Sequence, residues 1–236
     1  MNRTLSAIAI TLGLTGLTAH ASAQDEALQE EGSVELSEAP AAATGAQGKL
    51  RVYGGLRLGF GGEVEFKPDG GGATSKDDLL LTLGGQGGVD YVIMDFFALG
   101  GELRLAGVNT ESRDDADIGG DVIIDVAVKP RGRYALSGIP LEIYGTLPIG
   151  VSFIKTSGDL NKGGVEFSQG PGLNLGIGAG ATYFFTDNLG INGEMAYLMY
   201  WYGATSEATF AGVKTKAEAD ISFGQLSLFA NLVYAL

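Results

Sequence analysis

ADISFGQLSLFANLVYAL, residues 219–236, ends the chain and alternates between apolar and polar side chains over most of its length. From Gln225 onward, every second residue is apolar, and the residues between include Gln225, Ser227 and Asn231. A period of two predicts a β-strand with one apolar and one polar face. The apolar face of this predicted strand carries Leu226, Leu228, Ala230, Leu232, Tyr234 and Leu236.

The same alternation recurs along the chain from residue 48. Met195 and Tyr197 alternate with Glu194, and Val126 alternates with Asp125. Helical spacing fits none of these segments better, so the pattern predicts an all-β fold. The eight predicted strands cover about residues 49–60, 79–93, 97–108, 120–134, 140–154, 171–185, 189–202 and 219–236.

The connections between these strands differ in length in a regular way. Residues 94–96, 137–139 and 186–188 form short turns, whereas 61–78, 109–119, 155–170 and 203–218 form long, polar, Gly-rich loops. Short turns at one end, long loops at the other and an even number of strands are typical of outer-membrane barrels. We therefore predict an eight-stranded antiparallel up-and-down transmembrane β-barrel over residues 48–236, with its long loops facing outward.

The polar face decides which side of the barrel meets water. A soluble lipid-binding barrel shows the same alternation, but its polar face should be crowded with charged residues. Here that face carries glycines such as Gly88 and Gly180 among a few charges, which suits the crowded interior of an eight-stranded barrel. Aromatic residues near the strand ends of the apolar face predict girdles at two membrane interfaces: Phe60, Phe153 and Trp201 near the long loops, and Tyr91, Phe97, Tyr134, Tyr183 and Tyr234 near the short turns.

The first 47 residues have a different composition. Arg3, an apolar run over residues 5–17 and Ala21-Ser22-Ala23 predict a signal peptide over residues 1–23. Residues 24–47 are acidic and then Ala-rich, which predicts a flexible periplasmic tail; a marginal helix over residues 25–36 is the alternative. The predicted location is thus the outer membrane, with the N-terminal tail in the periplasm.

The composition excludes several classes of function. Without Arg3, 14 basic and 28 acidic residues remain, so the mature charge is −14 and nucleic acid is not an expected partner. The chain has no Cys, and its single His, His20, lies in the predicted signal peptide. The commonest general base and the usual transition-metal ligands are therefore missing, so we expect neither enzymatic activity nor a cofactor. A Ser/Lys or carboxylate-pair mechanism remains open.

Charged residues of both signs fall on the predicted inward face. Such residues must pair with one another or meet water, because an unpaired buried charge costs several kcal/mol. A structural network of ion pairs is the favoured interpretation, and a gated ion or proton path is the alternative. The inward set is Arg51, Arg57, Glu102, Arg104, Asp125, Lys129, Glu142 and Glu194.

Three further motifs have structural interpretations. Loop 109–119 and Asp121 gather five carboxylates, but without the spacing of a Ca²⁺-binding loop, so a solvated acidic loop is favoured. The run Gly176–Gly180 has no following Lys and no helix, which excludes a phosphate-binding loop. Pro148 lies within the fifth predicted strand, where the missing N–H predicts a β-bulge.

A family resemblance rests on two segments. YFFTDNLGINGEMAY, residues 183–197, is similar to a strand-turn-strand unit of outer-membrane barrels, and the last strand, with Gly224, Leu232 and Tyr234, resembles their C-terminal assembly signal. The last residue is Leu236 rather than the usual Phe or Trp. Residues 48–236 thus resemble the small OmpA/OmpX-type barrels, which implies a membrane anchor with a packed lumen and no shared enzymatic activity.

The expected role follows from this resemblance. We predict a structural or surface-interaction protein whose partners are outer-membrane lipid, lipopolysaccharide and, during biogenesis, the barrel-assembly machinery. The ligand of the surface loops is not assigned. A narrow pore for small solutes is the first alternative, and a soluble lipid-binding barrel is the second.

Overall fold

The computed structural model describes residues 47–70, 72–108, 121–155, 165–210 and 213–236, all within the compact unit Glu38–Leu236. The predicted signal peptide and nearly all of the predicted tail lie outside these residues. Within them, no helix is long and apolar enough to cross a membrane. The strands are β1 Leu50–Phe60, β2 Glu63–Pro68, β3 Ser75–Asp78, β4 Thr82–Met94, β5 Phe97–Val108, β6 Asp121–Ala135, β7 Leu141–Thr146, β8 Ile149–Lys155, β9 Val165–Gln169, β10 Gly172–Phe184, β11 Leu189–Phe210 and β12 Val213–Ala235.

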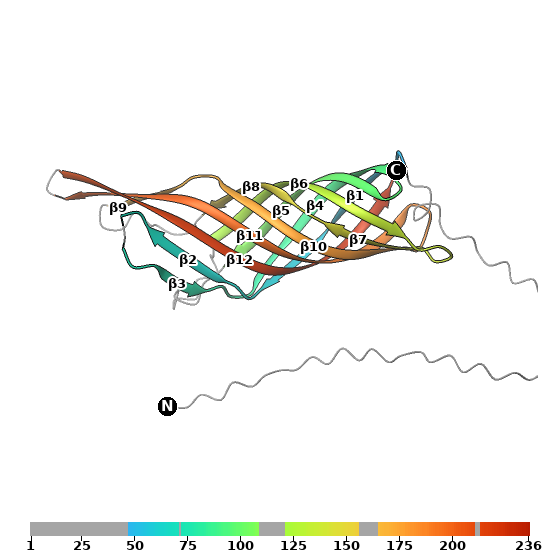
Figure 1. Cartoon of the computed structure of the whole chain (residues 1–236), viewed down its shortest axis with the longest axis horizontal. Coiled ribbons are helices and arrows are strands. Elements are labelled where there is room, and N and C mark those ends of the chain that lie inside the picture. The colour runs from blue at the N-terminus through green and yellow to red at the C-terminus, as the bar shows by residue number, and fades with distance from the viewer. Residues whose placement is uncertain (1–46, 71, 109–120, 156–164, 211–212) are drawn as a thin grey trace, which may run out of the picture. The chain divides into compact units, whose positions relative to one another are not determined.

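The barrel is a closed ring of antiparallel strands (Figure 1). In order around the ring, β12 pairs with β1, followed by β4, β5, β6, the β7 and β8 pair, β10 and β11, which pairs again with β12. Closure between the two ends of the described chain is set by pairs such as Tyr53 with Val233. Counting β7 and β8 as one, the described ring has eight strands, so the predicted fold class is confirmed.

Pro148 interrupts a strand without adding a residue to it. β7 and β8 are separated by Leu147 and Pro148, yet both pair with β10 in one continuous register, Thr146 with Gly178 and Ile149 with Leu175. The predicted bulge at Pro148 is therefore wrong. The ladder loses the proline donor, while the Pro148 carbonyl still accepts a hydrogen bond from Gly176 N at 2.8 Å. The pairing of β4 with β5 does shift, between Val92 and Met94.

Three of the predicted long loops contain strands. β2 pairs with β12, β9 pairs with β11, and β3 pairs with β2, which gives the order β3-β2-β12-β11-β9. We call the surface sheet β2, β3 and β9 together with residues 202–210 of β11 and 213–221 of β12. It lies beyond the barrel, at the end opposite the short turns (Figure 1). The loop interpretation of 61–78, 155–170 and 203–218 is thus wrong for these residues, whereas loop 109–119 lies outside the described part.

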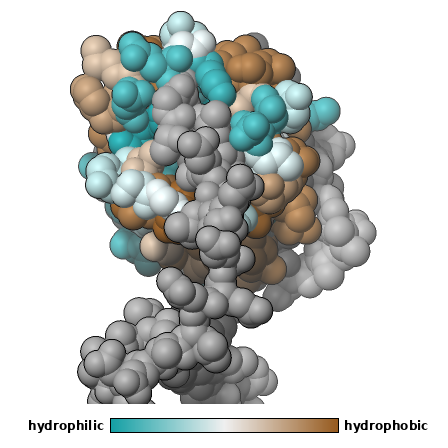
Figure 2. Space-filling model, turned by 90° about the vertical axis from the view of Figure 1, so that its right-hand side faces the viewer, coloured by the Kyte–Doolittle hydropathy of each residue, from teal (hydrophilic) through white to brown (hydrophobic). Residues whose placement is uncertain are grey.

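The two faces of the barrel wall have the predicted orientation. Leu56 is 68% exposed and Val126 50% exposed, whereas Arg51 and Lys129 are buried. Figure 2 views the barrel from its short-turn end, with apolar residues along the flanks and hydrophilic residues across the end. All the predicted girdle aromatics lie on the outward face; Phe60 and Phe97 are half-buried there and the others are exposed. A soluble barrel with an apolar cavity has the opposite arrangement of faces.

Candidate functional site

All eight charged residues predicted to face inward are buried in the lumen. Three more lie beside them that the sequence prediction missed: Asp90, Arg131 and Arg133. All three share the parity of inward residues on their strands: Asp90 follows Gln86 on β4, and Arg131 and Arg133 follow Lys129 on β6, past Pro130. Among the described lumen residues, six cations thus face five carboxylates.

A three-residue ion cluster lies near the short turns. Glu142, at the start of β7, accepts hydrogen bonds from Arg51 Nη1 at 2.9 and 3.0 Å and from Arg133 Nε at 2.8 Å. The Arg51 guanidinium also lies 5.1 Å from the centre of the Phe184 ring, within cation–π range. Both guanidiniums therefore share one buried carboxylate, and the cluster joins the three strands β1, β6 and β7.

A second cluster occupies the middle of the lumen around Lys129. Its Nζ lies 2.9 Å from both Glu102 Oε2 and Glu194 Oε2. Two tyrosines from other strands donate further hydrogen bonds to these carboxylates: Tyr53 donates to Glu102 at 3.3 Å and Tyr144 donates to Glu194 at 2.9 Å. Charge-assisted hydrogen bonds of this kind are about twice as strong as neutral ones.

Arg131 extends this central cluster toward the short turns. Its Nη1 lies 2.7 Å from Asp90 Oδ2, and its guanidinium carbon lies 4.1 Å from the centre of the Tyr144 ring. The tyrosine that contacts Glu194 thus also stacks against a cation. The arrangement joins β4, β6, β7 and β11 across the lumen.

A third cluster surrounds Asp125 toward the surface sheet. Tyr200 donates to Asp125 Oδ2 at 2.9 Å and Ser152 donates to Oδ1 at 2.5 Å. Arg57 and Arg104 lie 3.5 and 3.4 Å from Oδ2. Each lumen carboxylate in the described residues is therefore within 4.0 Å of a cation.

An apolar cluster lies beyond Asp125, between the ion clusters and the surface sheet. Its buried members include Leu79, Ile123, Leu198, Tyr202 and Phe223. The Tyr200 ring, which also contacts Asp125, stacks on Phe223 with centroids 4.6 Å apart. The lumen is consequently filled first by ion pairs and then by packed rings and aliphatic side chains.

Glycines make room for the large polar side chains. A Cβ at Gly88 would lie 2.5 Å from the Tyr53 hydroxyl, and a Cβ at Gly180 would overlap the Tyr144 hydroxyl. Both tyrosines contact the central cluster, so the glycine-rich inward face is explained by packing. The run Gly176–Gly180 lies within β10 and is not a loop.

Among the described residues, no group of three Asp, Glu, His or Cys is placed to hold a metal ion; loop 109–119 and the side chain of Asp121 lie outside them. On the surface sheet, a hydrogen bond from Lys76 to Glu63 raises the pKa of Lys76. A hydrogen bond from Lys216 likewise lowers the pKa of Glu218.

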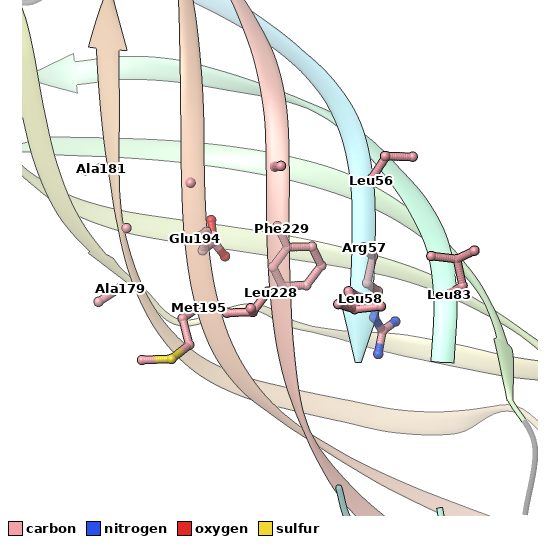
Figure 3. Close-up of a pocket in the computed structure, with 13 residues that line it drawn as sticks. Leu56, Arg57, Leu58, Leu83, Ala179, Ala181, Glu194, Met195, Leu228 and Phe229 are labelled. Atoms are coloured by element: carbon pink, nitrogen blue, oxygen red, sulfur yellow. The ribbon is translucent and has the colours of Figure 1, made fainter. Parts of the chain in front are cut away.

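The outer wall carries an apolar groove of about 820 Å³ that crosses β10, β11, β12, β1 and β4 (Figure 3). Small residues, among them Ala179, Ala181 and Gly193, lie where the wall is hollowed, and Leu228 and Leu83 lie at other points of its lining. The lining is almost entirely apolar, which suits hydrocarbon chains rather than a polar ligand.

Comparisons with known proteins agree with this geometry. No protein-family model and no curated protein matches the chain. Among solved structures, the chain is similar to the outer membrane protein OprG from Pseudomonas aeruginosa, at 12% identity and a TM-score of 0.64, over 81% of this chain and 97% of OprG. It is also similar to the outer membrane protein AlkL, at 15% identity and a TM-score of 0.50, over 91% of this chain and 97% of AlkL. The outer membrane protease OmpT from Escherichia coli matches at 12% identity and a TM-score of 0.45, over 79% of this chain and 97% of OmpT. The similarity to OprG and AlkL shows that the chain has the fold of the small outer-membrane β-barrels.

Proposed function

Starting from the fold that this chain shares with small outer-membrane β-barrels, we propose that it is a non-enzymatic outer-membrane anchor with a sealed lumen. Its role is to hold the surface sheet outside the membrane as an interaction surface. The observation that carries this proposal is the continuous filling of the lumen, from the Arg51–Glu142–Arg133 cluster to the apolar cluster around Phe223.

Membrane insertion is supported by the outer wall. Closing the ring satisfies the backbone groups of every wall strand, which a hydrocarbon environment requires. Aromatic side chains such as Tyr134 and Trp201 lie at its two ends, and an apolar band lies between them. The groove across β10 to β4 offers a place for lipid chains. Outer-membrane lipid, lipopolysaccharide and the barrel-assembly machinery are the proposed partners, and the N-terminal tail is proposed to lie in the periplasm.

Sealing of the lumen is supported by the cost of opening it. An ion that crosses the barrel must separate pairs such as Lys129–Glu194 and Arg131–Asp90, whose distances are 2.9 and 2.7 Å. Breaking a buried ion pair costs about 3–5 kcal/mol. Because the clusters follow one another along the lumen, the ion would have to break several such pairs. The geometry therefore favours an anchor over a conduit.

Conductance in planar lipid bilayers tests the proposal. We expect the purified barrel to insert without discrete conductance steps, and Glu102→Gln and Arg104→Gln to be equally silent. Steps in the unmodified protein that change in size or selectivity in either variant would overturn the sealed lumen. A weakly active enzyme would be revealed by turnover of fluorogenic peptide or ester substrates, and we expect none.

A narrow conduit is the second candidate, and one observation favours it. Several buried polar atoms, including Arg104 Nη1, Asn174 Nδ2 and Gln225 Nε2, have no hydrogen-bond partner among the described residues. These atoms lie on the inward face of the wall, where a water molecule or small ion would meet them. The same bilayer recording decides between the two candidates.

A further inference from the structure

A polar groove lies on the outward face where the barrel wall meets the surface sheet. Its volume is about 440 Å³, within the range of small-molecule sites. Strand pairing sets its two rows: Trp201, Ser222 and Glu65 lie side by side on β11, β12 and β2, and Gly203, Asp220 and Lys67 form the next row.

Gly203 accounts for the hollow beside the Trp201 ring. A Cβ at Gly203 would meet nothing within 4 Å, so the space above this residue is open. Trp201 is 44% exposed, and the neighbouring Lys67 and Asp220 are exposed as well. An apolar ring therefore borders a space that is lined on its other sides by polar groups.

The chemistry of the lining is mixed in a specific way. The indole offers an electron-rich face and one N–H donor, Ser222 offers a hydroxyl, and Lys67 offers an ammonium. The Glu65 and Asp220 carboxylates offer oxygens that accept hydrogen bonds. An interfacial tryptophan requires only an aromatic ring at the membrane surface, so that role does not account for the groups beside it.

A sugar ring matches this set of groups. One face of a pyranose presents C–H groups that pack on an aromatic face, while its edge presents hydroxyls that need both donors and acceptors. Two carboxylates against one ammonium give the groove a negative balance, which disfavours phosphorylated or sulfated sugars.

We propose that this groove binds a neutral or amino-substituted saccharide, with one ring stacked on Trp201 and its hydroxyls bonded to Asp220, Glu65, Lys67 and Ser222. This inference rests on the proposed function, because it requires the surface sheet to lie outside the membrane. The sugar comes either from the headgroup of a membrane glycolipid or from a free glycan.

The sequence supplies a direct reporter, because Trp201 is the single tryptophan of the chain. We would titrate the refolded barrel in detergent with maltose, chitobiose, glucosamine and glucose 6-phosphate while recording tryptophan emission. We expect a saturable change with at least one of the first three, and binding of glucose 6-phosphate at least about tenfold weaker, which is 1.4 kcal/mol.

Two variants and one matched control test the groove itself. Asp220→Asn and Glu65→Gln remove charged acceptors and should each weaken binding about tenfold. Asp78→Asn, which changes an exposed carboxylate on β3 outside the groove, should leave binding unchanged. Heat-modifiable gel migration verifies that each variant is folded.

The source of the sugar is separated by a second arm with vesicles. The barrel is reconstituted in phosphatidylcholine with or without a monoglucosyl diacylglycerol. An emission change that needs the glycolipid assigns the groove to a lipid headgroup, and a change with free sugars assigns it to soluble glycans. No saturable change in either arm, or a change that Asp220→Asn and Glu65→Gln leave intact, overturns the proposal. Bilayer conductance decides the sealed lumen independently of both arms.

Discussion

At the scale of single residues, Glu142 is the carboxylate on which two buried arginines converge. It is fully buried, and Arg51 and Arg133 contact it from different strands. Glu142→Gln keeps the shape of the side chain but removes the charge that both guanidiniums share. We expect this variant to lower the free energy of unfolding by about 3–5 kcal/mol, because it leaves buried charge uncompensated. Urea titration of the barrel in liposomes, followed by tyrosine and tryptophan fluorescence, measures the change.

The control for this prediction is Glu218→Gln on the surface sheet. Glu218 is exposed and pairs with Lys216, also exposed, at 2.6 Å. Exposed pairs contribute little to stability, so this variant should unfold at nearly the same urea concentration as the unmodified barrel. Equal effects of the two substitutions would mean that the Glu142 cluster does not stabilise the fold.

Two glycines in adjacent strands form a second matched comparison. Gly180 faces the lumen, where an added Cβ would overlap the Tyr144 hydroxyl. Gly193 faces outward, and a Cβ added there would meet nothing within 4 Å. Gly180→Ala should cost about 1–3 kcal/mol by overpacking, whereas Gly193→Ala should be neutral or slightly stabilising. Thermal unfolding followed by circular dichroism distinguishes the two, and similar melting temperatures would contradict the packing argument.

At the residue scale, the sequence predicted the direction of side chains better than their partners. Parity assigns all eight charged residues to the inward face, because a strand in a barrel has only two faces, and the structure buries all eight. It gave no information on which strands lie opposite one another across the lumen. The Arg51–Glu142 pair joins residues 91 positions apart, so it could not be predicted without the ring closure.

At the scale of elements, the wall strands were predictable and the surface sheet was not. β5 begins and ends where alternation predicts, at Phe97 and Val108. β2 and β9 are only six and five residues long, and the outward face of β2 carries Glu65 and Lys67 in place of the apolar residues of the wall strands. They form strands because β11 and β12 continue past the barrel and offer unpaired edges on which to add. That cause is tertiary and is not visible in the local sequence.

The outward face of the wall carries a prediction about depth in the membrane. Val126 and Leu228 are exposed residues of the apolar band. Val126→Arg or Leu228→Arg should destabilise the barrel by about 2–4 kcal/mol if the residue lies at the bilayer midplane. Ile139→Arg is the control, because Ile139 is exposed in the short connection between β6 and β7. Unchanged stability of the first two variants in liposomes would refute the proposed membrane-facing side.

The hairpin that extends β11 and β12 should be separable from the barrel. Wall pairing of β11 with β10 ends at Trp201, and that of β12 with β1 ends at Leu226. Replacing residues 207–216 by Asn-Gly, which favours a tight hairpin turn and keeps the Ser206–Ala217 pair beside it, should therefore leave a closed barrel. We expect the shortened protein to retain its heat-modifiable gel shift, and loss of that shift would mean that the outer part of the β11–β12 hairpin is required for closure.

At the scale of the whole molecule, the charges are distributed unevenly. The chain has a formal charge of −13, whereas the described lumen holds six cations and five carboxylates. The acidic excess is therefore carried by residues other than this lumen set, and among the described residues Asp78, Glu218 and Asp220 lie at exposed positions. A negative exterior opposes non-specific association with anionic surfaces.

The closed ring as a whole gives a direct prediction. A barrel whose wall strands all pair on both sides resists detergent until it is heated. Unboiled protein should therefore migrate differently from boiled protein on a denaturing gel, and membrane fractionation should recover it with the outer membrane. Recovery in the soluble fraction without a gel shift would contradict both the barrel anchor and the proposed location.

One feature of the surface sheet also sets an order of events. β2, near the start of the barrel, pairs with β12 at its end, so Phe66 meets Ile221 across 155 positions of sequence. The β2–β12 part of the surface sheet consequently cannot assemble before the last strand has arrived. Contacts so distant in sequence form slowly, and a ligand or antibody that recognises the assembled β2–β12 sheet would therefore report finished molecules and pass over chains still in the course of folding.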